Sequence, residues 1–249
     1  MHLPDGFLNH GTASGLAGAA AAAVSFALAK VRAAFLEKVP VLKRRFATFP
    51  DMGGGEVSWQ SRFSVLGREK MWQMASVGSL IFAAQMVNFP IAGGTSGHVL
   101  GGVLAALIVG PFEGLIVIAL VLAVQAFAFG DGGVWALGAN IINMGLVGTL
   151  GGYGLFVLAK KLMKNEKKTF LLCAGCAAWL SVVAAAGAAS VELSVSGTAP
   201  FASVLSAMMR YHVLIGLGEM VITVGILAAL KKKKYPIAAL ESEKEKVIP

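Results

Sequence analysis

Charged residues are scarce in this sequence: they make up 14% of its 249 positions, whereas hydrophobic residues make up 57%. A typical soluble domain carries about 25% charged residues, so an ordinary soluble globular domain is a poor fit to this composition. The mean hydropathy is +0.75, and the apolar content would supply about seven spans of roughly 20 residues each. The chain is therefore predicted to be a polytopic membrane bundle with an all-α fold.

The sequence also lacks the residues that several functions require. Cys173 and Cys176 are the only cysteines, and they form a C-x-x-C motif within an apolar run, where packing is favoured over redox or metal chemistry. No phosphate-binding loop of the form GxxxxGK[ST] is present, so any ATP hydrolysis that its function required would take place on another chain. No nucleophile and base stand at a spacing typical of catalysis, so we expect a protein that is not an enzyme.

Apolar runs bounded by charge, Gly or Pro predict seven membrane helices. They are expected at residues 13–29, 72–89, 98–110, 113–129, 134–159, 169–190 and 204–230. The run at 98–110 is short for a full span. It is expected to be tilted, partly unwound, or paired tightly with the next helix through Gly110-Pro111-Phe112.

The 21 Lys and Arg residues are confined almost entirely to three segments. All except Arg210 lie at 30–70, at 160–168 or beyond 230, and the positive-inside rule places these segments in the cytoplasm. With seven spans, the N-terminus is then outside and the C-terminus is cytoplasmic. The formal charge of +8 reflects this orientation, and nucleic acid is not an expected partner.

A single integral membrane domain is predicted over residues 1–230, followed by a charged cytoplasmic tail at 231–249. Residues 31–70 are expected to form a long cytoplasmic loop with room for a short amphipathic segment at the membrane surface. The tail is expected to be a solvated end. No Lys or Arg precedes the first apolar run, so the first residues are expected to belong to the mature protein.

Under this topology most polar residues near the membrane fall toward its outer half. They are Asn88, His98, Gln125, Asp131, Asn140, Asn143 and His212. Polar groups inside a bilayer are costly and usually face a cavity or each other, so their shared depth favours an outward-opening polar site. Ordinary hydrogen bonds between helices are the alternative for any one of them.

The first two residues, Met1 and His2, form a possible chelate. The amine of Met1, the amide nitrogen of His2 and the His2 Nδ1 atom can close a five-membered and a six-membered ring on one metal ion. A deprotonated amide nitrogen suits square-planar Ni²⁺, Cu²⁺ or Co²⁺, and His98 at the same membrane face could complete an N4 plane. Taken alone, each histidine is more often a structural residue. Glycines before His98 allow close backbone approach, and Thr95 or Ser96 could cap a helix or orient the imidazole.

Three motifs are distinctive in this sequence. They are Met1-His2-Leu3-Pro4-Asp5-Gly6-Phe7; the run from Phe82 to Pro90 (FAAQMVNFP) leading into Gly93 to His98 (GGTSGH); and Phe129 to Gly133 (FGDGG) followed by Leu137 to Gly145 (LGANIINMG). Together they closely resemble the substrate-capture (S) subunit of energy-coupling-factor cobalt/nickel transporters, the CbiM/NikM family. The segment 31–70 is longer than the link that the family usually has between its first two helices.

The resemblance implies a seven-helix S subunit whose N-terminus inserts into the bundle and chelates Co²⁺ or Ni²⁺. The ligands would be the Met1 amine, the His2 amide and imidazole, and the His98 imidazole. Around them we expect supporting contacts from Asn88, Thr95, Ser96, Asp131 and Asn140, although Asp131 between glycines is equally a turn residue.

The resemblance also implies partners: a transmembrane coupling subunit, two cytoplasmic ATPase subunits and a small auxiliary membrane subunit. The complex would import metal across the cell (inner) membrane by ATP-driven transport, with no cofactor beyond the transported ion. Cobalt import would serve cobalamin biosynthesis. The alternative is a stand-alone secondary metal or cation transporter in which His212 and Glu219, which share a helix face, carry protons or ions. An internal polar contact between this pair is favoured over such a route.

Overall fold

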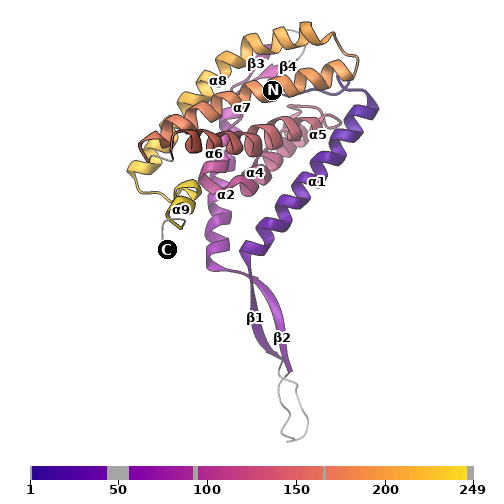
Figure 1. The fold of residues 1–249 in the computed structure, drawn as a ribbon. Coiled ribbons are helices and arrows are strands. Elements are labelled where there is room, and N and C mark those ends of the chain that lie inside the picture. The colour runs from indigo at the N-terminus through magenta and orange to yellow at the C-terminus, as the bar shows by residue number, and fades with distance from the viewer. Residues whose placement is uncertain (1, 44–55, 92–94, 165–166, 246–249) are drawn as a thin grey trace, which may run out of the picture.

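The computed structural model describes residues 2–43, 56–91, 95–164 and 167–245. In these ranges the chain forms a helical bundle (Figure 1). The helices are α1 (His10–Phe35), α2 (Val65–Gln85), α3 (Gly102–Val109), α4 (Pro111–Val124), α5 (Leu137–Asn140), α6 (Gly152–Leu162), α7 (Phe170–Val195), α8 (Phe201–Lys232) and α9 (Ala238–Glu245). Wider π-helical turns extend α4 over Gln125–Phe129 and join α5 to α6 over Ile141–Gly151, and a 3₁₀ turn at Lys167–Thr169 precedes α7.

Five of the seven expected membrane helices are long and apolar enough to cross a bilayer. They are His10–Phe35, Pro111–Phe129, Leu137–Leu162, Phe170–Val195 and Phe201–Lys232. This confirms an all-α, multi-pass membrane protein. The count of seven stays a prediction, because α2 carries charged residues near its start and α3 has only eight residues.

The short run at 98–110 contains α3, which is joined tightly to α4. Gly110 takes a φ of +114°, a conformation that favours glycine, and Pro111 begins α4 immediately afterwards. Every residue of α3 is buried. A helix that is apolar on all sides belongs in the interior, and α3 accordingly packs against α2, α4, α6 and α7.

An antiparallel hairpin replaces the loop that the sequence predicted at 31–70. Strand β1 (Leu36–Lys43) pairs with β2 (Glu56–Phe63) so that Leu36 lies opposite Phe63 and Lys43 opposite Glu56. The hairpin projects from the helical body (Figure 1). In the sequence of β2, Val57, Trp59 and Phe63 stand two or four positions apart with polar residues between them, a pattern that suits a strand and not an amphipathic helix.

A second, shorter pair of strands connects α2 to α3. Strand β3 (Phe89–Ile91) pairs antiparallel with β4 (Thr95–Gly97). His98 follows β4 directly and lies four residues before α3, whereas the sequence had placed it at the start of a helix.

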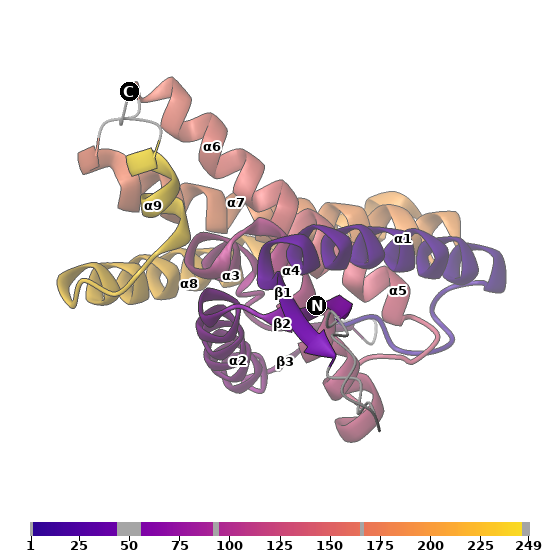
Figure 2. The same cartoon turned by 90° about the horizontal axis from the view of Figure 1, so that it is seen from below.

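The C-terminal segment is more ordered than a solvated tail. Helix α9 packs against α3 (Figure 2), and the side chains of Ile237 and Ala239 are buried. The sequence expectation missed this because the charged residues of the segment suggested only solvent exposure.

The two ends of the bundle differ in charge among the described residues. Basic side chains occur in the last turns of α1, α6 and α8 and near the start of α2: Arg32, Arg68, Lys70, Lys160, Lys161, Lys231 and Lys232. The N-terminal segment, β4 and the turn before α5 lie at the other end, toward which the sequence placed most of the polar residues near the membrane.

Helix α1 approaches α5 through a glycine. A Cβ atom at Gly138 would lie 2.5 Å from the backbone N and Cα atoms of Ala17. Overpacking of this kind typically costs about 1–3 kcal/mol, so Gly138→Ala should lower the melting temperature of the purified protein in detergent. Gly154→Ala in α6 is the matched control, because a Cβ there meets nothing within 4 Å. Equal melting temperatures for the two variants would contradict the close α1–α5 contact.

Candidate metal-binding site

The N-terminal segment is held inside the bundle by its main chain. The Leu3 amide donates to Asn140 Oδ1 at 2.8 Å, and Asn140 Nδ2 donates back to the Leu3 carbonyl at 3.2 Å. The Gly133 amide also donates to the Leu3 carbonyl, at 2.9 Å. The Leu3 side chain is fully buried against Ala136, Ala139 and Leu193. This docking fixes where His2 lies.

Asp5 fastens the same segment to the turn before α5. Its carboxylate accepts from the amides of Val134 at 3.1 Å, Trp135 at 2.8 Å and Ala136 at 3.3 Å. The Thr198 hydroxyl donates to the Phe7 carbonyl. Asp5 stands between Pro4 and Gly6, a sequence typical of a tight turn, and nothing in that local pattern indicates this long-range contact.

The imidazoles of His2 and His98 lie side by side. Their ring centroids are 4.5 Å apart with the planes tilted by 40°, and the residues are only 3% and 1% exposed. Two histidines that are 96 positions apart in the sequence therefore meet in one buried place. Met1, the other predicted ligand residue, lies outside the described residues.

His98 is held in one tautomer. Its Nδ1 lies 2.7 Å from the Val99 carbonyl oxygen. Because a carbonyl can only accept, Nδ1 carries the hydrogen, and in the neutral ring Nε2 keeps its lone pair. Nε2 is buried and has no hydrogen-bond partner among the described residues. Burial lowers the pKa of His98 well below its usual range, and the nearby His2 lowers it further, so the ring stays neutral and able to bind a metal ion.

His2 is paired with Asp131. The His2 Nδ1 atom lies 2.9 Å from Asp131 Oδ1. Burial lowers the pKa of His2, while the hydrogen bond to Asp131 opposes this shift. The same hydrogen bond is the main cause that lowers the pKa of Asp131. At neutral pH the pair is therefore a neutral imidazole that donates Nδ1–H to a carboxylate. The chelate predicted from the sequence needs this same nitrogen.

The other predicted supporting residues have different positions. Asn140 binds the Leu3 main chain, and the exposed Asn88 places Nδ2 3.5 Å from Asp131 Oδ1. Thr95 and Ser96 lie in β4, where they pair with Ile91 and Pro90. Asp131 thus joins Asn88 and His2, while Asn140 acts on the segment that carries His2.

Of the other buried polar residues that the sequence singled out, His212, Glu219 and Asn143 have separate partners. His212 Nδ1 donates to the Met208 carbonyl within α8 at 2.8 Å, whereas Glu219 binds main-chain amides of residues 100 and 101. The internal contact expected between these two is therefore not formed. Asn143 donates to Glu192 of α7 at 2.7 Å.

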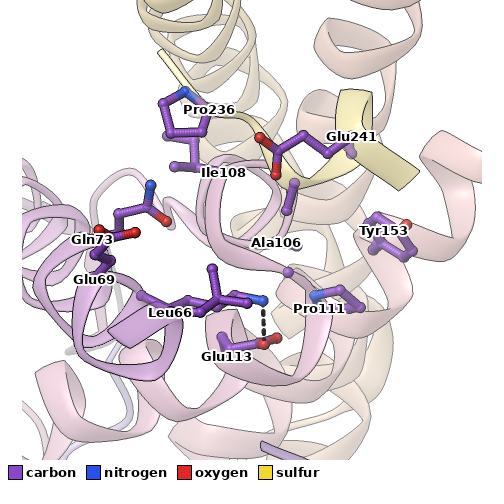
Figure 3. A pocket seen from close by; sticks show the side chains of 14 residues that line it. Leu66, Glu69, Gln73, Ala106, Ile108, Pro111, Glu113, Tyr153, Pro236 and Glu241 are labelled. Carbon is purple, nitrogen blue, oxygen red and sulfur yellow. Dashed lines mark ion pairs between the residues drawn. The ribbon is translucent and has the colours of Figure 1, made fainter. Parts of the chain in front are cut away.

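A cavity of about 530 Å³ lies elsewhere, at the far end of α3 from His98 (Figure 3). It is lined by the start of α2, the α3–α4 junction and the segment around α9, and an ion pair of 2.7 Å joins Lys70 to Glu113 at its wall. Neither histidine lines the cavity, and its first lining residue in α3 is Ala106, eight positions after His98. The histidine pair and the cavity are therefore distinct sites.

The described ranges contain no group of three or more His, Cys, Asp or Glu side chains that could hold a metal ion. A metal at His2 and His98 would therefore need donors besides these side chains. Main-chain nitrogens at the start of the chain have the required chemistry.

The fold and this site define a multi-pass membrane protein with two buried, neutral imidazoles at one end of its bundle. Residues 58–237 match the family model described as cobalt uptake substrate-specific transmembrane region, CbiM. The chain belongs to this family, as its motifs predicted.

Relatives with established names match much of the chain. It is 31% identical over 180 residues to the fused nickel transport protein NikMN of Rhodobacter capsulatus, covering 67% of this chain and 52% of that protein. It is 31% identical over 164 residues to the cobalt transport protein CbiM of Sorangium cellulosum, covering 65% of this chain and 73% of that protein. The chain spans about half the length of several curated relatives that it matches.

A solved structure described as a transition metal transporter has the same fold. It superposes with a TM-score of 0.75 at 27% identity and covers 93% of each chain. A truncated transition metal transporter gives a TM-score of 0.74 at 26% identity, covering 94% of this chain and all of that one.

Removal of the Asn140 side-chain amide should loosen the N-terminal segment. Asn140→Leu leaves the buried Leu3 amide without its acceptor, which typically costs about 1–3 kcal/mol, so hydrogen exchange at Leu3 should speed up by about fivefold or more. Asn143→Leu, one turn further along, is the control because Asn143 binds Glu192 and not the N-terminal segment. Unchanged exchange at Leu3 in the Asn140 variant would show that this pair of bonds does not hold the segment.

Proposed function

We propose that this chain captures Co²⁺ or Ni²⁺ with high affinity, as the substrate-binding membrane subunit of an ATP-driven importer of the energy-coupling-factor type. The observation that carries the proposal is the buried contact between His2 and His98, with the His98 Nε2 lone pair directed by the Val99 hydrogen bond. Relatives named for cobalt and nickel transport support this choice of substrate.

The proposed ligands are four nitrogens: the Met1 amine, the His2 amide, His2 Nδ1 and His98 Nε2. For His2 Nδ1 to bind, the metal ion has to replace the hydrogen that now points to Asp131. When the ring turns over, its Nε2–H can donate to Asp131 instead, so the carboxylate would support the ring in the loaded state too. Neutral imidazoles at both positions favour capture at neutral pH.

The proposed topology has seven spans, in which α2 and the buried α3 complete the set of five long apolar helices. Basic residues at one end of the bundle support a cytoplasmic location for that end, with the N-terminus and metal site outside and the C-terminus inside. Residues 1–230 then form the membrane domain of a cell-membrane protein, and 231–249 lie in the cytoplasm.

Helix α1 supports the existence of a membrane partner. Small residues form a stripe along its exposed side: Gly11, Gly15, Gly18, Ala22 and Ser25. Such a stripe allows another membrane helix to approach closely. We propose that the coupling subunit docks here, and that ATP hydrolysis takes place on two separate cytoplasmic ATPase subunits, with an auxiliary membrane subunit completing the complex. The chain itself is then not an enzyme.

Extension of the chain by a single Gly before Met1 tests the chelate. The added residue moves the free amine out of the five-membered ring, so affinity for Ni²⁺ or Co²⁺ should fall by about 100-fold or more while the fold is retained. Binding is measured by isothermal titration calorimetry on the protein in detergent. Unchanged affinity for Ni²⁺ or Co²⁺ would contradict the N-terminal chelate.

His98→Ala should weaken binding in the same assay, since it removes the fourth nitrogen. Two controls match it: His10→Ala removes an exposed histidine of α1, and Cys176→Ala removes a half-buried thiol of α7. Both should bind metal as the wild type does. A loss of affinity in the controls equal to that in His98→Ala would point to general damage.

Proton release gives a second test that does not depend on substitutions. Coordination displaces the amide proton of His2 and the proton of an amine whose usual pKa is about 7.7–8.0, while burial keeps the imidazoles of His2 and His98 neutral. About two protons should therefore leave per metal ion at pH 7, and affinity should fall as the pH is lowered. Calorimetry in buffers of different ionisation enthalpy counts them. Release of no proton would contradict amide coordination.

A further inference from the structure

Glu219 of α8 forms a buried contact with the chain just after His98. Its Oε2 atom accepts from the Leu100 amide at 2.8 Å, and its Oε1 atom accepts from the Gly101 amide at 2.7 Å. The residue is 2% exposed. Both carboxylate oxygens are thus used by the segment between β4 and α3.

This contact leads to His98 through one peptide group. The peptide unit between Val99 and Leu100 donates its N–H to Glu219. Its C=O accepts from the His98 Nδ1–H, with 2.7 Å between the Val99 oxygen and Nδ1. A carboxylate, a peptide and an imidazole therefore form a continuous chain of hydrogen bonds. Hydrogen bonds in such a chain polarise one another, and this strengthens each of them in a buried place.

The geometry of the segment depends on this carboxylate. Gly101 takes a φ of +75°, and no side-chain cap is present at this start of α3. Turning the peptide between Val99 and Leu100 over would remove its N–H from Glu219 and its carbonyl from His98. The two amide donors and the carboxylate therefore hold the carbonyl toward the imidazole, which keeps the hydrogen on Nδ1 and the lone pair on Nε2.

We propose that Glu219 is a positioning residue for metal capture, acting on His98 through the peptide between Val99 and Leu100. The role resembles that of carboxylates that orient metal-bound histidines directly, except that a peptide group stands between the two side chains. It ties the metal site to α8, so a shift of α8 would move the His98 ring. The inference rests on the proposed function for the identity of the metal, whereas the tautomer of the His98 ring does not depend on that function.

Glu219→Gln tests the proposal. The carboxamide keeps one acceptor and turns an NH₂ group toward the second amide, so the peptide loses its fixed orientation. Affinity for Ni²⁺ should fall by about 10- to 100-fold, the usual effect of losing a residue that supports a metal ligand. The absorption band of bound Ni²⁺ should shift toward that of His98→Ala. Glu219→Asp keeps the carboxylate and should retain more affinity than Glu219→Gln.

The matched control is Glu192→Gln, which neutralises a buried carboxylate of the neighbouring helix α7 that binds Asn143. It should leave Ni²⁺ affinity within about twofold of the wild type. The melting temperature of each variant shows whether it folds. If Glu219→Gln does not accumulate as folded protein, Glu219→Asp is compared with the wild type instead: its side chain is one methylene shorter and should hold the two amides less well, so its affinity should still fall, and wild-type affinity would overturn the proposal.

A double-mutant cycle shows whether Glu219 acts through His98. In the His98→Ala background, Glu219→Gln should change affinity by no more than about twofold, because the residue that it positions is gone. Additive losses in the double variant, or full affinity in Glu219→Gln, would overturn the proposal.

Nitrogen NMR of the metal-free protein separates this inference from the proposed function. The ¹⁵N shifts of His98 should show a single Nδ1–H tautomer in the wild type and a mixture in Glu219→Gln. If the wild type binds no Ni²⁺ or Co²⁺, the proposed function fails, while the tautomer measurement still decides the role of Glu219. If both proteins show the same tautomer, the inference fails even when the wild type binds metal.

Discussion

The hydrogen bonds between Asn140 and both polar groups of the Leu3 main chain are the constraint on which the candidate site depends. A main chain that enters an apolar bundle loses its water, so its N–H and C=O groups need partners there. Asn140 supplies both for Leu3, and Asp5 supplies an acceptor for three amides of the opposite turn. These contacts hold the segment that carries His2 in the position where its ring meets His98.

The two histidines are anchored to different parts of the molecule. His2 belongs to a segment fastened to α5 and to the turn that carries Asp131, whereas the segment that contains His98 is fastened to α8 by Glu219. A metal ion held by both would link these parts. The affinity of such a junction for the metal ion would depend on the relative position of the two parts, and binding would in turn favour one position. Coupling of metal capture to a movement within the membrane requires such a dependence.

Much of the architecture was predictable because its signals are local. Apolar runs predicted the five long helices to within six residues at either end, and Gly110 with Pro111 indicated the tight α3–α4 pair. The hairpin at Leu36–Phe63 was missed because charge suggested a loop, although alternating Val and Trp residues in β2 carried a strand signal. Helix α9 was missed because charged residues flank Ile237 and Ala239 in the sequence. The burial of these two side chains depends on the packing of this segment against α3.

The sequence by itself determined the class of protein and the charge of the two bundle ends, because hydropathy and charge are local properties of the chain. Its motifs also identified His2, His98, Asp131 and Asn140 as candidate site residues. Only the tertiary structure decided how these groups pair. His2 and Asp131 are 129 positions apart, and Leu100 and Glu219 are 119 apart. Whether an imidazole offers Nδ1 or Nε2 depends on a single hydrogen bond from such a partner, and no local pattern encodes its direction.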